Sequence, residues 1–196
     1  MASTESFVIK TPCSSANIGP GFDVIGLALS MYLELHVSID RSKTQSSHPL
    51  NCHITYEGEG EDGGEISLDP QSNLLTRVAL YVLRCHGQRS FPCETHVHIK
   101  NPIPLGRGLG SSGAAVVAGV MLGKECGGLH HLTPERLFDF CLMIGASLPL
   151  LSERDALTRD IQNATRTTWA LPSLAASWAP TSSRWRPRTW PASRSR

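Results

Sequence analysis

The sequence predicts an α+β domain, in which most strands come early in the chain and helices separate or follow the later ones. Two observations carry this prediction. Four segments rich in β-branched and aromatic residues roughly alternate apolar and polar side chains, as half-buried strands do: 7–10, 32–39, 53–57 and 94–100. Three later segments have helical signals instead: 73–86, 111–126 and 133–144.

Each expected helix has its own signal. After Asn73, apolar residues recur at helical spacing, so this segment is expected to be amphipathic. Segment 111–126 is rich in alanine and valine and ends before a pair of glycines. At the third helix, Thr133 is a suitable N-cap, Pro134 suits the first helical position and Glu135 places an acid in the first turn.

Composition excludes several classes of protein. With 196 residues, of which 40% are hydrophobic and 18% charged, the chain can bury a core and is neither collagen-like, coiled-coil nor wholly disordered. A net charge of +1 gives no sign of a nucleic-acid partner. Without the six arginines after Thr165, the preceding residues hold 12 basic against 17 acidic side chains. We therefore expect no nucleic-acid partner.

Compartment and thiol state follow from other features. The N-terminus lacks the basic and apolar regions of a secretory signal, and no stretch is apolar for long enough to span a bilayer. We expect a cytoplasmic protein with no membrane partner. The six cysteines are widely spaced without a Cys-x-x-Cys pair, so they are expected to be free and mostly buried.

The strongest local signal is a glycine-rich loop between a predicted strand and a predicted helix. Its glycines allow backbone N–H groups to surround an anion such as a phosphate, and the two serines at its end can cap the helix, bind phosphate oxygens or reach a magnesium ion. A tight turn with a serine cap is the simpler alternative. The spacing matches neither a Walker A loop nor a dinucleotide fingerprint. The candidate residues are Pro104, Leu105, Gly106, Arg107, Gly108, Leu109, Gly110, Ser111 and Ser112.

A second candidate lies in residues 12–29. Its Gly-Pro-Gly sequence at 19–21 forces a turn, flanked by the amide of Asn17 and the carboxylate of Asp23. Polar groups held by a stiff turn suit the recognition of a small polar substrate. An Asx-type turn, in which both side chains bond the local backbone, is the alternative.

Together, the two segments resemble the first and second motifs of the GHMP small-molecule kinases, and residues 15–29 are most similar to the homoserine kinase branch. The resemblance covers residues 7–144 and implies a ribosomal protein S5 domain 2-like fold. It further implies that the 104–112 loop holds the phosphates of ATP, that Ser112 assists Mg2+, that Asn73 lies near the nucleotide base, and that Asn17 and Asp23 hold L-homoserine.

The resemblance implies transfer of the ATP γ-phosphoryl group to the hydroxyl of L-homoserine, giving O-phospho-L-homoserine for threonine biosynthesis. Three alternatives stay open: another GHMP kinase acting on mevalonate or a sugar, a non-catalytic ATP-binding remnant, and an RNA-binding S5-like sheet, which the acidic composition before the tail disfavours. The resemblance is also compatible with a homodimer when the protein is full length.

The composition changes near Ile144, so we expect an ATP-binding domain in residues 1–144 and an aberrant, disordered tail in residues 145–196, with the family's C-terminal domain missing. Every tryptophan lies in this tail, which has no glycine after Gly145. Read in another frame, codons for residues 163–181 are compatible with Arg-His-Pro-Asp-Asn-Val, the family's continuation after a glutamate that splicing would restore. Our hypothesis is a retained intron over residues 145–162, with weak or no activity as the consequence. A natural disordered basic tail is the alternative.

Overall fold

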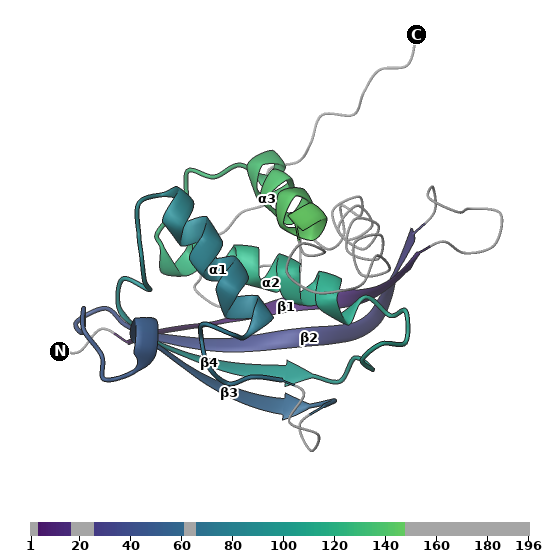
Figure 1. Cartoon of the computed structure of the whole chain (residues 1–196), viewed down its shortest axis with the longest axis horizontal. Helices are drawn as coiled ribbons and strands as arrows, with labels where there is room; N and C mark the ends of the chain where they lie inside the picture. The colour runs from purple at the N-terminus through teal and green to yellow at the C-terminus, as the bar shows by residue number, and fades with distance from the viewer. Residues whose placement is uncertain (1–3, 17–25, 61–65, 148–196) are drawn as a thin grey trace, which may run out of the picture.

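The computed structural model describes residues 4–16, 26–60 and 66–147. Within these ranges, three strands are followed by a helix, a fourth strand and two further helices, with one short 3-10 helix, η2 (Pro49–Asn51), before the third strand. Figure 1 shows the three α-helices together on one face of the sheet. The α+β architecture is as predicted. No helix in the described part of the chain is long and apolar enough to cross a membrane.

The described strands form one mixed sheet in the order β1-β2-β4-β3. Strand β2 pairs antiparallel with both β1 and β4, whereas β3 and β4 are parallel and are connected through helix α1. A parallel pair requires such a crossover connection. Each strand contains the segment predicted for it; the bounds are β1 Thr4–Ala16, β2 Gly26–Asp40, β3 Cys52–Gly58 and β4 Glu94–Asn101.

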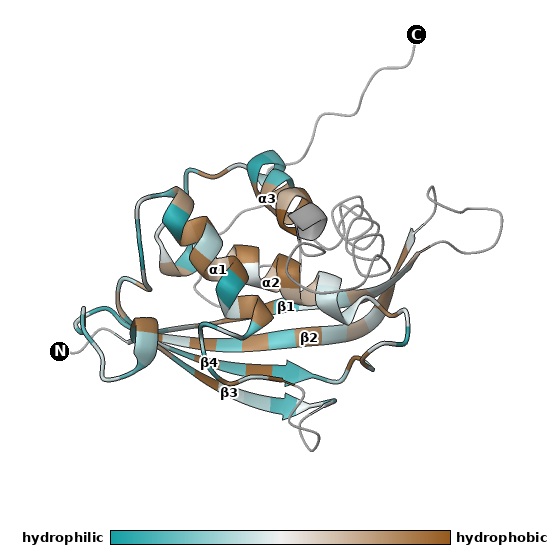
Figure 2. Ribbon diagram, viewed as in Figure 1, coloured by the Kyte–Doolittle hydropathy of each residue, from teal (hydrophilic) through white to brown (hydrophobic). Residues whose placement is uncertain are grey.

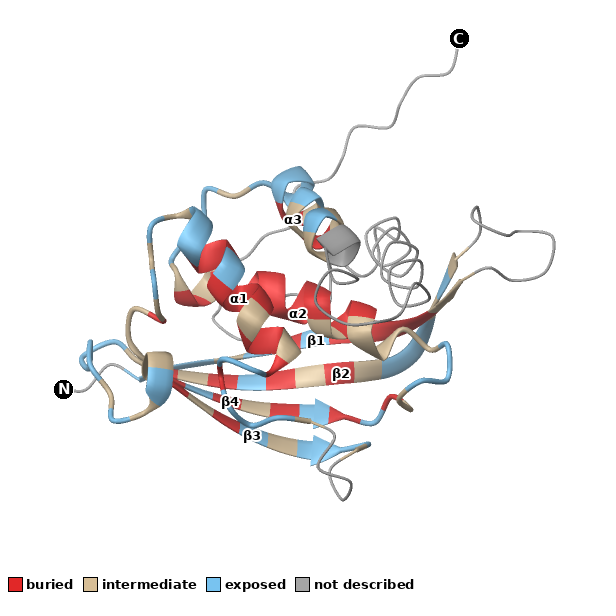
Figure 3. Cartoon of the chain, in the orientation of Figure 1, coloured by how far each residue is buried: buried red, intermediate tan, exposed pale blue. Residues whose placement is uncertain are grey.

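The two faces of the sheet differ in burial because side chains alternate along each strand. In β2, Leu33, Leu35, Val37 and Ile39 face the helices, and none is more than 2% exposed. The residues between them are polar and lie on the opposite face, as the banding of Figure 3 shows. The core therefore lies between the sheet and the helices.

Helix α1 (Leu74–Cys85) packs against helix α2 (Ser111–Cys126). Most of α2 is buried, and Figure 2 shows the apolar character of this central helix. Two glycines of α2 allow the close approach: a Cβ added at Gly119 would lie 2.5 Å from the carbonyl oxygen of Leu75, and one at Gly123 would lie 2.8 Å from that of Ala79. Helix α3 (Pro134–Ser147), the next element after α2 in the sequence, also packs against α2.

Several boundaries differ from those predicted; strand β2, for example, begins at Gly26, six residues before the predicted start. Strand β1 continues through residues 12–16, which the sequence places in a polar recognition segment, because Thr11, Cys13 and Ser14 are buried and this stretch pairs with the start of β2. The third helix was predicted to end at Ile144, yet it continues to Ser147. Asn17 and Asp23 lie outside the described residues, as does the tail from residue 148 onward.

Candidate functional site

The glycine-rich loop leads from the end of β4 into α2, as predicted. Gly106, Gly108 and Gly110 have φ angles of 66°, 70° and 68°, a left-handed conformation that side-chain-bearing residues rarely adopt. An added Cβ at Gly106 or Gly108 would meet nothing within 4 Å, whereas one at Gly110 would collide with the hydroxyl oxygen of Ser14. The first two glycines therefore border open space, and the third is required for close packing on β1.

Helix α2 begins without a side-chain cap. Its N-cap is Gly110, and the helical ladder starts where the N–H of Ala114 donates to the Gly110 carbonyl oxygen at 2.8 Å. The N–H groups of Ser111, Ser112 and Gly113 precede that ladder. They lie at the positive end of the helix dipole, with no acidic residue in the first turn. This end of the helix can bind an anion.

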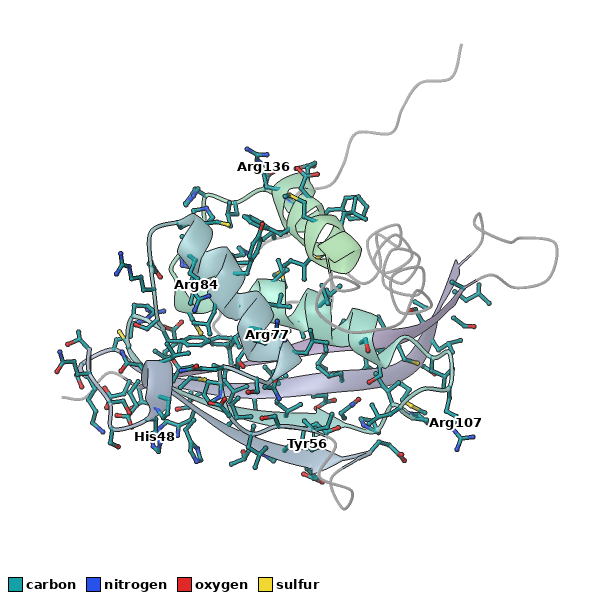
Figure 4. All side chains as sticks on the ribbon, viewed as in Figure 1. His48, Tyr56, Arg77, Arg84, Arg107 and Arg136 are labelled. Carbon is teal, nitrogen blue, oxygen red and sulfur yellow. The ribbon has the colours of Figure 1, made fainter. Side chains whose placement is uncertain are left out.

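Strand β1 fixes the position of the loop. The backbone N–H of Ser14 donates to the carbonyl oxygen of Leu109 at 3.0 Å, just before the helix begins. The end of β1 and the start of α2 therefore lie side by side. Arg107, at the tip of the loop, is exposed and points outward in Figure 4.

A cavity of about 250 Å³ opens between the first turns of α1 and α2 and the neighbouring edge of the sheet. It brings together Asn73 with Leu105, Ser111 and Ser112 from the predicted loop. The remaining lining residues are Leu33, Tyr56, Ile66, Ser67, Ser72, Leu74, Leu75, Ile99, Asn101 and Ala115. The apolar side chains can contact a flat ring, and the uncapped helix end supplies donors for a charged group.

Asn73 is the N-cap of α1 and is 5% exposed. Its Oδ1 atom accepts a hydrogen bond from the N–H of Leu75 at 3.0 Å, and its Nδ2 group donates to the carbonyl oxygen of Ser67 at 2.8 Å. These bonds hold the wall of the cavity and leave one amide hydrogen for other contacts.

Sequence reasoning missed Asn101, a cavity residue at the end of β4 that is 4% exposed. Its Nδ2 group donates to the hydroxyl oxygens of Tyr56, at 3.1 Å, and Ser111, at 3.2 Å, and its Oδ1 accepts from the N–H of Ile103 at 3.2 Å. Asn101 thus connects β3, the loop and α2. The available signal was its place, directly after a predicted strand and just before the glycine-rich loop.

The histidines of β4 lie elsewhere. His96 and His98 are on the sheet face away from the helices, where each ring approaches a glutamate, His96 next to Glu94 at 3.2 Å and His98 next to Glu57 at 3.4 Å. Among the residues that the structure describes, no group of three or more His, Cys, Asp or Glu is arranged to hold a metal ion. Of the cysteines, Cys13, Cys52, Cys126 and Cys141 are buried, Cys93 is half-buried and Cys85 is exposed.

These features define the class of protein. Residues 73–149, which include the loop, both flanking helices and Asn73, match the family model of the GHMP kinases N terminal domain. This part of the chain is therefore similar to the N-terminal domain of the GHMP kinases. Among these kinases, the chain is similar to homoserine kinases: it is 56% identical over 141 residues to the homoserine kinase of Saccharomyces cerevisiae, an alignment that covers 71% of this chain. The chain spans 39% of the length of that relative.

Solved structures agree with this placement. The homoserine kinase of Cytophaga hutchinsonii superposes with a TM-score of 0.56 at 27% identity, covering 75% of this chain and 42% of that one. The mevalonate kinase of Methanococcus jannaschii superposes with a TM-score of 0.55 over 84% of this chain and 51% of its own. At 14% identity, this second likeness shows the fold alone.

Proposed function

We propose that the cavity and the glycine-rich loop bind ATP, and that the protein to which this domain belongs phosphorylates L-homoserine. The observation that carries the proposal is the loop itself. It places three left-handed glycines before an uncapped helix, beside a cavity, in a chain 56% identical over 141 residues to a homoserine kinase.

The residues present fit the triphosphate of ATP. Gly106 and Gly108 border open space, so an anion can approach the backbone closely, and the first N–H groups of α2 point out of the helix end. Ser112 lines the cavity one residue into the helix, and its hydroxyl oxygen would serve as a ligand of Mg2+. Bound Mg2+ would neutralise phosphate charge. Asn73, in the wall of the same cavity, is assigned to the side of the base.

The proposed reaction is an in-line phosphoryl transfer. The side-chain hydroxyl oxygen of L-homoserine forms a bond to the γ-phosphorus, the bond from that phosphorus to the bridging oxygen of ADP breaks, and the hydroxyl proton is released. Positioning and charge stabilisation supply most of the catalysis in such a reaction. The loop amides, especially those of residues 108–112, would stabilise the charge on the phosphoryl oxygens.

The acceptor is assigned to homoserine on sequence similarity. Asn17 and Asp23 are proposed to bind it, with the Asp23 carboxylate suited to an ammonium group. For the rival acceptor, mevalonate, the mevalonate kinase likeness at 14% identity shows the fold and not the substrate, whereas the homoserine kinase of Saccharomyces cerevisiae matches at 56%. O-phospho-L-homoserine is an intermediate for threonine, so we place the reaction in threonine biosynthesis.

We propose that residues 145–162 are a translated intron and that residues 163–196 are read out of frame. A Gly145 codon can supply the GT of a splice donor, and a Gln162 codon the closing AG. Sequencing spliced transcripts across the Ile144 codon tests this: a transcript joining Ile144 to an in-frame Glu-Arg-His-Pro continuation supports it, and a gene with no intron there contradicts it. The chain as printed is then expected to bind ATP with weak or no turnover.

Two measurements test the function. Calorimetric titration of the 196-residue chain with MgATP should show saturable binding. Adenosine alone should bind with lower affinity. A coupled ADP assay on the protein with the restored frame should respond to L-homoserine and not to mevalonate or galactose. ATP binding without turnover in the restored protein would support a non-catalytic remnant. A folded chain that binds no ATP would contradict the proposal.

Two finer properties belong to the same proposal. The buried thiols suit a reducing compartment, so we place the protein in the cytoplasm. We propose a homodimer for the full-length form, which light scattering of the restored protein tests. The substrates are then ATP and a small amino alcohol, with no role for nucleic acid or membrane.

A further inference from the structure

The end of β4 holds a hydrogen-bond network whose directions can be worked out from one fixed donor. The backbone N–H of Ile103 can only donate, so the atom of the Asn101 amide that faces it, 3.2 Å away, is the oxygen Oδ1. The Asn101 NH2 group must therefore face the other two partners, the hydroxyls of Tyr56 and Ser111. Both hydroxyl oxygens accept from it.

The two hydroxyl groups differ in the acceptor to which each donates its proton. The Tyr56 hydroxyl, while accepting from Asn101, donates to the carbonyl oxygen of Glu59 at 2.6 Å. The Ser111 hydroxyl also accepts from Asn101, but within the described residues it donates to no protein acceptor. Ser111 lines the cavity at the first position of α2, so its proton is free for a ligand there.

The backbone of Asn101 makes this arrangement rigid. The Asn101 carbonyl oxygen accepts from the N–H of Glu59 at 3.0 Å, and Gly58 lies so close to that carbonyl that a Cβ there would collide with it. Asn101 is 4% exposed, so its amide is held by protein bonds from three directions. The loop begins three residues later, at Pro104.

We propose that Asn101 is a positioning residue for the nucleotide site: its amide keeps the Ser111 hydroxyl oriented as a donor toward an anionic oxygen of the ligand and fixes the start of the glycine-rich loop. This inference rests on the proposed function. Asn101 acts through Ser111 and does not itself touch the phosphate. The ligand oxygen that receives the Ser111 proton belongs to the triphosphate.

The test compares ATP with adenosine, because the ratio of the two affinities reports on the triphosphate alone. Ser111→Ala removes the donor and should weaken MgATP binding by roughly tenfold, with adenosine binding unchanged, since a hydrogen bond to a charged group is worth about that much. Ser111→Thr keeps the hydroxyl and should retain most of the affinity. In Asn101→Asp, the new carboxylate still accepts from the N–H of Ile103 but has no proton to donate. The Ser111 hydroxyl then donates to this carboxylate and no longer to the ligand.

The double variant separates orientation from charge. If Asn101→Asp acts through the Ser111 hydroxyl, its effect on the affinity ratio should shrink in the Ser111→Ala background. If it acts only by repelling phosphate, the two effects add and the proposal fails.

The matched control is Asn51→Asp. The Asn51 amide also accepts from a backbone N–H, that of Ser46, and donates to two carbonyl oxygens, those of Thr44 and Phe91, outside the cavity. Asn51→Asp should lower the melting temperature without changing the ratio of ATP to adenosine affinity.

The outcomes separate this inference from the proposed function. A wild-type chain that binds no ATP overturns both. A wild-type chain that binds ATP, with an affinity ratio unchanged in Ser111→Ala, overturns the inference and leaves the proposed function standing. If Asn101→Asp does not fold, the pair Ser111→Ala and Ser111→Thr still decides, because equal MgATP affinities for the two overturn the inference.

Discussion

Glycines serve two different purposes in neighbouring regions of this domain. At the contact between α1 and α2, Gly119 and Gly123 leave no room for a side chain, because backbone and side-chain atoms of α1 occupy the space. In the loop before α2, Gly106 and Gly108 border empty space and are required by their positive φ angles. A glycine with no free space beside it serves helix packing, whereas a glycine that borders open space leaves room for a ligand.

The largest expected effect is at the helix contact. Gly119→Ala would place its Cβ 2.5 Å from the Leu75 carbonyl oxygen and 2.8 Å from the Val78 Cβ, so α1 must move. Overpacking costs about 1–3 kcal/mol, with the upper end expected here, and the helix propensity of alanine offsets roughly 1 kcal/mol. We expect a net loss of about 2 kcal/mol in the free energy of unfolding, measured by urea titration. An unchanged urea midpoint would show that the helices are not closely packed.

The second prediction addresses the loop. Gly108→Ala forces a left-handed alanine, which costs about 1–2 kcal/mol of stability, and it places a methyl group in the space proposed for phosphate. We expect MgATP affinity to fall by about tenfold. Gly128→Ala is the matched control, because Gly128 has a φ of 65° and equally open surroundings beyond the end of α2. It should cost similar stability and leave ATP binding intact; equal effects of the two variants on ATP binding would break the comparison.

Much of this fold could be predicted because its signals are local. The signals for three elements depend on residues a few positions apart: the alternation in β2, the glycine pair that ends α2, and Thr133 and Pro134 at the start of α3. All three elements form around the predicted segments, although β2 begins earlier and α3 ends later than predicted. The glycine-rich loop is likewise local. Its place before a helix follows from the glycine spacing, whereas the left-handed φ angles of its glycines are seen only in the structure.

The residues that were missed depend on contacts between distant segments. Asn101 is important because Tyr56 of β3 and Ser111 of α2 meet at its amide, and no spacing in the sequence records that meeting. Similarly, β1 continues past Thr11 because Ser14 packs beneath Gly110, nearly a hundred positions away. The pairing of Asn17 and Asp23 with the loop stays a prediction.

A third prediction concerns the wall of the cavity. Asn73→Ala removes the N-cap of α1 and its bond to the Ser67 carbonyl, and it should lower the free energy of unfolding by about 1 kcal/mol. Asn73→Asp keeps the acceptor for the Leu75 N–H and should lose less. Because Asn73 is assigned to the side of the base, which ATP and adenosine share, the ratio of ATP to adenosine affinity should stay constant in both variants. Thermal melts and calorimetric titration check the two parts, and a changed ratio would place Asn73 near the phosphates.

The smallest effect is expected on the face of the sheet away from the helices. Here ionisable histidine rings lie close together, and the expected cost is electrostatic, not steric. His53 lies 4.7 Å from His48 and 5.5 Å from His96 between ring centroids, and burial, followed by these two neighbours, lowers its pKa below the usual value. The unfolded chain therefore binds this proton first, so stability should fall as the pH drops through about 6.5. His53→Gln should flatten that fall between about pH 7.5 and 5.5, as measured by urea titrations of the wild type and the variant across this range. Parallel pH profiles for the wild type and His53→Gln would contradict this prediction, because they would show that His53 does not bind its proton more weakly in the folded chain than in the unfolded one.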